Sequence, residues 1–290
     1  MVKEAVALEL LLVCPVCQGQ LHRKNDESVC ENCGREYRWH DGILDATPAP
    51  PPDQDVAEKW GLWEQLQANG EVSYTEAPDL NLSIGKREDA KFFGDFADLS
   101  GLTLDIGCGP QELPSYGAGV KGSLVGIDPL MGRQPRDFAF VKGIGEYLPF
   151  ADNTFDRALF ATSLDHMLSP VRALKEAARV VKPGGGVAVW YGEVHDHQDE
   201  PKGSYFTKAA AMLKRGDIAG LAKAVAAKTG LSRNRRAYME RLQQPEGAVD
   251  IYHFFHVEDE ALREWIAQVG LTVAREGGLG ANRFVYAVKG

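Results

Sequence analysis

The chain has 290 residues, of which 44% are hydrophobic and 25% are charged, and its formal net charge is −9. This length and apolar content suffice for a catalytic domain with a small accessory module, and they exclude a chain that is disordered throughout. The excess of acidic residues argues against general electrostatic capture of nucleic acid.

The first apolar stretch, Ala5 to Val13, is interrupted by Glu9. It is too short to span a bilayer, which requires about 20 apolar residues. It also lacks the basic start and the small-residue cleavage site of a signal peptide. We therefore expect a soluble, cytoplasmic protein without a membrane span.

Four of the five cysteines form two Cys-x-x-Cys pairs, and a glycine, Gly19 or Gly34, follows each pair within two positions. A Cys-x-x-Cys turn brings two thiolates to one ion, and a nearby glycine relieves strain where backbone N–H groups turn toward the sulfur atoms. Disulfides or an iron site are the alternatives, but disulfides are uncommon without a secretion signal. The spacing predicts a structural zinc ion with no open position for catalysis. Its ligands would be Cys14, Cys17, Cys30 and Cys33.

The segment around these cysteines, roughly residues 8–46, resembles the zinc-ribbon activator subunit of tRNA and release-factor methyltransferases. It also resembles the ribbon at the head of bacterial large-subunit rRNA guanine-N1 methyltransferases. The resemblance implies a ribbon that stabilises the chain or docks a partner protein or RNA. Residues 1–46 hold five basic and eight acidic side chains, and a ribbon of that sign is a poor clamp for RNA.

A proline-rich run from Thr47 to Asp53 follows and favours an extended, semi-rigid spacer. We place the domain boundary there, with a zinc ribbon at residues 1–46, a linker at 47–54 and a catalytic domain at 55–290. Residues 55–93 show helical spacing in patches, and we interpret the tryptophans there as core packing.

Two short apolar strands with acidic ends come next. The first, residues 102–106, leads into a turn in which Gly107 and Gly109 permit tight bending and close approach of a ligand. The second ends at Asp128, whose carboxylate can accept hydrogen bonds from both hydroxyls of an adenosine ribose. Strand, turn, second strand and acid in this order predict a nucleotide-type cofactor in a doubly wound sheet.

These residues resemble the first motif of class I S-adenosylmethionine-dependent methyltransferases, acid-x-Gly-x-Gly-x-Gly. Asp105 and the two glycines match it, and Gln111 replaces the third glycine. Residues 143–161 are similar to the adenine-side loop and fourth strand of that family, although Ile144 stands where many relatives carry an acid. Residues 169–186 are similar to its next helix, which we expect Ser169 to cap and Pro183 to end. The resemblance spans about residues 99–190 and is close to the ubiquinone-biosynthesis-like subgroup.

This resemblance implies an α/β fold, a Rossmann-like methyltransferase sheet with helices on both faces. It also implies S-adenosylmethionine as the cofactor. A nicotinamide-dependent oxidoreductase would share the glycine turn and the ribose acid, but the Leu-Pro-Phe loop and the helix ending in Lys-Pro-Gly-Gly belong to the methyltransferase pattern. The expected cofactor-binding residues are Asp105, Gly107, Cys108, Gly109, Asp128, Pro129, Gly145, Glu146 and Thr162.

Candidate catalytic groups follow the strand that ends near Ala161, at the sheet edge where ligands of open α/β folds bind. We select His166 as general base, oriented by Asp165, because the ordinary pKa of histidine lies near neutral pH. Local packing of His166 is the alternative. The aromatic run Tyr252 to His256 either lines an acceptor pocket or forms a core strand, and we favour the strand.

Residues 201–250 hold ten lysines and arginines against four acids, so the rest of the chain carries the negative charge. We expect a helical, basic insertion at about 198–250. Arg233, Arg235 and Arg236 near Tyr238 would suit a phosphate-bearing acceptor.

Three functions follow from these features. The first is methyl transfer to a small-molecule, sugar or lipid-linked acceptor. The second is methylation of rRNA or tRNA with the ribbon docking the substrate, and the third is a non-catalytic zinc-ribbon adaptor. The acidic charge of the chain favours the first.

Overall fold

The computed structural model of the chain describes residues 7–49, 51–76, 88–133, 135–192 and 241–290. The chain divides into two units, one formed by residues 1–193 and 244–290 and the other by residues 194–243. The arginines predicted to bind a phosphate, and most of the predicted basic insertion, lie outside the described residues. No helix in the described ranges is long and apolar enough to cross a membrane.

The N-terminal part forms a small antiparallel sheet of four strands in the order β1-β2-β3-β4, preceded by a 3-10 turn, η1 (Leu8–Leu11). The strands are β1 (Leu21–Lys24), β2 (Glu27–Cys30), β3 (Glu36–His40) and β4 (Ile43–Leu44). Burial alternates along β3, where Tyr37 and Trp39 face inward. The indole N–H of Trp39 donates to the Ser28 hydroxyl at 2.8 Å, which satisfies the polar atom of a buried ring.

The central sheet has seven strands in the order β10-β11-β9-β8-β5-β6-β7. Strands β5 to β9 are parallel, whereas β11 is antiparallel to both β9 and β10. The chain runs from β5 outward through β6 and β7 and then returns to β8 on the other side of β5. This reversal of strand order is the point at which open α/β sheets bind ligands. The strands are β5 (Ser100–Ile106), β6 (Lys121–Asp128), β7 (Ala139–Lys142), β8 (Phe155–Ala161), β9 (Val181–Gly192), β10 (Leu271–Leu279) and β11 (Asn282–Lys289).

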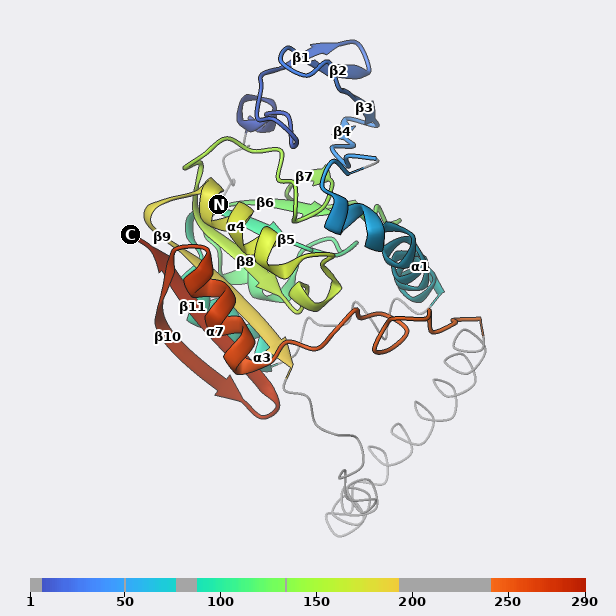
Figure 1. Cartoon of the computed structure of the whole chain (residues 1–290). Coiled ribbons are helices and arrows are strands. Elements are labelled where there is room, and N and C mark those ends of the chain that lie inside the picture. Colours follow the sequence, from blue (N-terminus) through green and yellow to red (C-terminus); the bar gives the residue numbers. More distant parts are fainter. Residues whose placement is uncertain (1–6, 50, 77–87, 134, 193–240) are drawn as a thin grey trace, which may run out of the picture. The chain divides into compact units, whose positions relative to one another are not determined.

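Helices cover both faces of this sheet, as the resemblance implied. Along β9, Val187 and Val189 join the core that contains α4 (Pro170–Val180) and α7 (Asp259–Gln268), while Ala188 and Trp190 join the core of α3 (Glu88–Ala97). This alternation is the period of two that a strand buried on both faces must show. Figure 1 shows α4 and α7 in front of the sheet. A fourth helix, α1 (Gln54–Glu76), packs Val56 and Trp63 over the loop that follows β7.

Two details differ from expectation. Ser169 stands at the N-cap of α4, but its side chain makes no capping hydrogen bond. The run from Tyr252 to His256 is not a core strand, because it has no regular secondary structure and its residues are half-buried or exposed.

The N-terminal sheet contacts the edge of the central sheet at two points. Directly after β4, Asp45 forms a parallel β-bridge with Lys142 at the end of β7, and the Ala46 N–H donates to the Lys142 carbonyl at 2.8 Å. The carboxylate of Asp45 also lies 2.8 Å from the Lys142 ammonium. At the second point, Leu12 bridges to Phe150 in the antiparallel sense. The two contacts thus hold both ends of residues 142–150.

Candidate active site

A cavity of about 250 Å³ lies where β5, β6 and β8 end, at the reversal of strand order. Parallel strands bring their carboxyl ends to one edge of a sheet, so residues distant in sequence meet there. Eight of the nine expected cofactor-binding residues line the cavity, namely Gly107, Cys108, Gly109, Asp128, Pro129, Gly145, Glu146 and Thr162. The ninth, Asp105, lies beneath the turn.

The glycine turn after β5 has the backbone that its sequence predicts. Gly107 has a φ of 78° and Gly109 a φ of 70°, in the left-handed region that favours glycine. A Cβ atom on Gly107 would lie 2.4 Å from the Cβ of Ser163, so no side chain fits there. Gln111, which replaces the third glycine of the motif, donates its amide N–H to the Cys108 carbonyl at 2.9 Å. Gln111 therefore stabilises the turn through a hydrogen bond within it.

Asp128 faces the cavity from the end of β6. Its Oδ2 accepts a hydrogen bond from the Gly109 N–H and its Oδ1 one from the Leu130 N–H, each at 2.8 Å. Burial raises the pKa of Asp128 from 3.8 to about 6, against the lowering effect of these two N–H groups. Each oxygen of a carboxylate has two acceptor positions, so Asp128 can still accept from ligand hydroxyls.

Asp105 is fully buried and accepts a hydrogen bond from the Tyr116 hydroxyl at 2.9 Å. Its other oxygen, Oδ1, has no hydrogen-bond partner among the described residues. Burial raises the pKa of Asp105 to about 7, the Tyr116 hydrogen bond opposes this effect, and the nearby Asp128 charge adds to it. Asp105 therefore shapes the turn from below and does not reach the cavity itself.

The charged residues that line this cavity differ from those of a pyrophosphate-binding site. Within the described ranges, its lining holds the carboxylates Asp128 and Glu146 but no lysine or arginine. Between β5 and β6 the chain forms only a 3-10 turn, η3 (Ser115–Gly119), whereas dinucleotide folds place the pyrophosphate at a helix N-terminus in this position. The electrostatics thus favour a cationic ligand over an anionic one.

The loop between β7 and β8 forms another wall of the cavity. A Cβ atom on Gly145 would lie 2.9 Å from a methyl group of Ile106, so the backbone approaches the sheet closely. Ile144 is buried against Trp63 and Tyr147. The carboxylate of Glu146 accepts a hydrogen bond from the Ser169 N–H at 3.1 Å, which satisfies the first of the unpaired backbone N–H groups at the start of α4.

Helix α1 contributes a wall that the sequence interpretation missed. Trp63, Leu66, Gly70 and Tyr74 line the cavity at spacings of three or four residues. The sequence favours core packing for the tryptophans, and Trp63 does belong to a buried cluster with Ile144 and Tyr147. A helical stripe is compatible with both roles, so this pattern alone held no signal that would have separated them.

His166 and His253 line the cavity and Asp165 lies beside them, so that one ligand atom of each residue is within 4.8 Å of the others. His166 ends a 3-10 turn, η4 (Leu164–His166), that follows β8, whereas His253 comes from the segment before α7. The Nδ1 of His166 lies 3.0 Å from the Tyr252 carbonyl oxygen. A carbonyl can only accept, so the ring proton lies on Nδ1 and the lone pair on Nε2.

Burial lowers the pKa of His166, although the Asp165 charge opposes this effect. The imidazole is therefore neutral at neutral pH. In this form His166 can accept a proton or bind a cation through Nε2.

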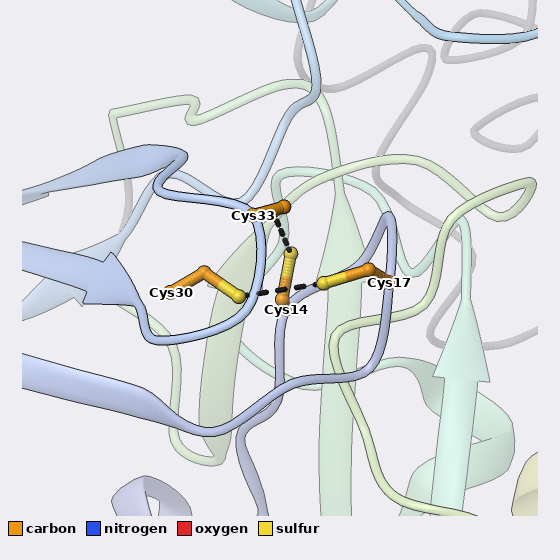
Figure 2. Close-up of side chains that lie close together, drawn as sticks. All are labelled: Cys14, Cys17, Cys30 and Cys33. Carbon is orange, nitrogen blue, oxygen red and sulfur yellow. Dashed lines mark hydrogen bonds between the residues drawn. The ribbon is translucent and has the colours of Figure 1, made fainter.

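The four N-terminal cysteines form a second cluster, in which all four sulfur atoms lie within 4.8 Å of one another. Figure 2 shows the side chains converging, with the sulfur of Cys14 3.7 Å from that of Cys33 and the sulfur of Cys17 3.4 Å from that of Cys30. None of them forms a disulfide. Backbone N–H groups of Gly19, Asn32 and Cys33 also hydrogen-bond to the sulfurs of Cys17 and Cys30, as expected of thiolate knuckles.

Residues 104–189 match a family model described as methyltransferase domain. Among curated proteins, demethylmenaquinone methyltransferase of Corynebacterium kroppenstedtii is 40% identical over 88 residues, which are 30% of this chain and 38% of that protein. Methyltransferase GfsG of Streptomyces halstedii is 33% identical over 101 residues, 30% of this chain and 36% of that protein. The chain thus spans well under half the length of these relatives.

A solved structure, Burkholderia thailandensis 1,6-didemethyltoxoflavin-N1-methyltransferase with bound 1,6-didemethyltoxoflavin and S-adenosylhomocysteine, superposes with a TM-score of 0.51. The superposition covers 93% of this chain and 98% of that one at 13% identity, so it shows the fold alone. The chain therefore has the Rossmann-like methyltransferase fold, and its residues 104–189 match the methyltransferase domain family.

Proposed function

We propose that the protein transfers a methyl group from S-adenosylmethionine to a small-molecule acceptor. The observation that carries this proposal is the cavity beside the glycine turn, whose described lining has two carboxylates and no lysine or arginine. S-adenosylmethionine carries a sulfonium cation and no phosphate, so it fits this charge pattern, whereas the pyrophosphate of a nicotinamide cofactor does not.

The residues of the cavity fit the parts of this cofactor. Asp128 has free acceptor positions for the two ribose hydroxyls, and the side-chain-free backbone of Gly107 permits close approach at the turn. Ile144 and Gly145 offer an apolar, closely approached wall for the adenine in place of the acid found in many relatives. When bound, the cofactor supplies an activated methyl group and its own leaving group. The protein then has to orient the acceptor and remove its proton.

On the acceptor side, we propose that Asp165 and His166 handle this proton. His166 lines the cavity together with Tyr252 and His253, and Asp165 lies beside the two histidines. The neutral state of His166 and the lone pair on its Nε2 support this role. Replacement of His166 by alanine should abolish methyl transfer while cofactor binding persists.

The curated relatives support a small-molecule acceptor, since one of them is named for demethylmenaquinone. The basic residues 201–250 would suit a phosphate or another anionic group on the acceptor. RNA is the second candidate because the N-terminal sheet resembles the ribbons of RNA-modifying enzymes. The acidic composition of residues 1–46 argues against it.

The proposal is tested in two stages. Calorimetry of the full chain with S-adenosylmethionine and with NAD should show binding of the first only, and binding of NAD alone would reject the proposal. Labelled methyl transfer is then measured into the RNA, lipid and small-molecule fractions of a cell extract, with Asp128→Asn as the inactive control. Label in RNase-sensitive material would reject the small-molecule acceptor and identify RNA as the acceptor instead.

We also propose that the four cysteines bind a structural zinc ion. With Zn–S bonds of about 2.3 Å, a tetrahedral site has sulfur–sulfur distances of about 3.8 Å, close to the 3.4 and 3.7 Å between the sulfur pairs. Four protein ligands leave no position for substrate, so this ion would stabilise the sheet β1–β4. Metal analysis should show that the Cys30→Ser variant holds one zinc ion fewer per chain than the wild type.

A further inference from the structure

We propose a second metal site, in which Asp165, His166 and His253 bind a divalent transition-metal ion at the acceptor side of the cavity. These are the three residues whose ligand atoms converge there. Binding of the ion does not depend on the proposed methyl transfer. Its use in catalysis, described below, rests on that proposal.

The protonation pattern of the cluster leaves three acceptors facing one another. The Nδ1 of His253 lies 2.8 Å from a carboxylate oxygen of Asp250, so its proton is directed to Asp250 and its Nε2 lone pair is turned the other way. His166 is fixed in the same sense by the Tyr252 carbonyl. Both Nε2 atoms thus meet the carboxylate of Asp165, at 3.9 Å for His166 and 3.8 Å for His253.

These distances fit a metal ion bound between the ligand atoms better than a hydrogen bond between each histidine and Asp165. A hydrogen bond between nitrogen and oxygen has a length of about 2.7–3.2 Å, so neither histidine is bonded to Asp165. An ion with bonds of about 2.0–2.2 Å separates its ligand atoms by roughly 3–3.6 Å, which small rotations of these side chains would reach. In addition, Asp165 Oδ1 is buried and has no hydrogen-bond partner in the described part of the chain. A cation would satisfy that oxygen.

The surroundings of the cluster match a transition-metal site. Histidine ligands of metals usually donate their second ring N–H to a carbonyl or a carboxylate, which fixes the ring. The Tyr252 carbonyl and Asp250 provide these two acceptors here. The backbone N–H groups of Tyr252 and His253 in turn donate to Asp250, at 2.7 and 2.9 Å. Two imidazoles and one carboxylate favour Zn²⁺, Fe²⁺ or Mn²⁺ over Mg²⁺, which prefers oxygen ligands.

An ion held by three protein ligands keeps coordination positions open for a substrate. An acceptor hydroxyl bound there would lose its proton to solvent, because the ion lowers the pKa of the hydroxyl. The acceptor oxygen then forms its bond to the methyl carbon while the carbon–sulfur bond breaks, and the electron pair stays on the sulfur of S-adenosylhomocysteine. In this scheme Asp165 and His166 act on the acceptor proton through the ion that they hold, and the His166 Nε2 lone pair is bound to that ion.

The test measures metal binding to the full chain without cofactor or acceptor. After incubation with Zn²⁺ and desalting, mass spectrometry should find two ions per wild-type chain and one in His253→Ala and Asp165→Asn. Titration with Co²⁺ separates the two sites, because a site without thiolates lacks the intense sulfur charge-transfer bands of the cysteine cluster. Asp250→Asn should weaken the second site by about 10–100-fold, as expected when a ligand loses its orienting partner.

His256→Ala is the matched control, because His256 is exposed and its ring centre lies 5.8 Å from that of His253 without belonging to the cluster. It should retain both ions, and circular dichroism shows whether each variant is folded. One ion in the wild-type chain, or two ions in folded His253→Ala and Asp165→Asn, would overturn the proposal. A chain with two ions that fails to bind S-adenosylmethionine would instead reject the methyl transfer and leave the metal site standing.

Discussion

Replacing Asp128 by asparagine should strengthen the unliganded fold and abolish cofactor binding. Burial holds the pKa of Asp128 at about 6, above its ordinary value of 3.8. A carboxyl group whose pKa is raised in the folded state destabilises the fold as the pH rises from about 4 to about 6. In this range the group has already lost its proton in the unfolded chain, whereas the folded chain still holds it. At pH 8 this loss is complete, and asparagine, which does not ionise, avoids it.

The magnitude follows from the same two values. At about 1.36 kcal/mol per tenfold change in proton affinity, a rise from 3.8 to about 6 corresponds to about 3 kcal/mol. Asparagine has one acceptor oxygen, whereas the N–H groups of Gly109 and Leu130 bond to different oxygens of Asp128, so one of them loses its partner at a cost of about 1–3 kcal/mol. We therefore expect the free energy of unfolding at pH 8 to rise by up to about 2 kcal/mol, the difference between the two effects.

Cofactor affinity should change in the opposite direction. The variant has lost the negative charge and the spare acceptor positions for the ribose hydroxyls, so binding of S-adenosylmethionine should weaken by at least about 100-fold, the equivalent of two hydrogen bonds to a charged group. Urea denaturation at pH 8 measures the first effect, and calorimetry on the same samples measures the second.

Asp156→Asn is the matched control. Asp156 accepts hydrogen bonds from the Leu102 N–H and the Lys182 ammonium, each at 2.8 Å, and these lower its pKa despite the opposing effect of burial. This variant should lose stability at pH 8 and retain cofactor binding, because Asp156 does not line the cavity. If Asp128→Asn also loses stability, or if it binds the cofactor normally, the assignment of Asp128 as a strained, cofactor-directed carboxylate is refuted.

Three further variants test the turn and the N-terminal sheet. In Gly107→Ala the new Cβ would lie 2.4 Å from that of Ser163 at a φ of 78°, so calorimetry should show weakened cofactor binding and denaturation a loss of at least about 1–2 kcal/mol. Lys142→Ala removes the half-buried ion pair with Asp45 and should cost about 0.5–1 kcal/mol, with no change expected if the two sheets are independent. Cys30→Ser should lose one zinc per chain and weaken cofactor binding, and a chelator should reproduce both effects in the wild-type chain.

The glycine turn and the position of Asp128 at a strand end were predictable because their constraints are local. Gly107 and Gly109 are required by the backbone of one turn, and Asp128 ends a strand whose apolar run is visible in the sequence. The same holds for α4, whose start at Pro170 follows from the fixed φ of proline. The bond between the Ser169 N–H and Glu146 was not predictable, because Glu146 comes from a different loop.

The acceptor side could be predicted only in part. His166 follows β8 directly, and its position at the sheet edge was evident from the strand pattern. Its partners were not, since Tyr252 lies 86 residues further on and in a segment without regular structure. The run that contains Tyr252 and His253 is rich in aromatic residues, which suggested a core strand. Only tertiary structure shows that its histidine meets Asp165.

The contacts of the N-terminal sheet support a role for this sheet that does not require RNA. Residues 143–148, which include the adenine-side wall of the cavity, are held at one end by the hydrogen bond from Ala46 to Lys142 and at the other by the Val13 N–H, which donates to the Pro149 carbonyl at 3.0 Å. Both anchors belong to the segment that the cysteine cluster organises. Loss of that cluster should therefore release both ends of the wall together, whereas a free docking module would leave cofactor affinity unchanged.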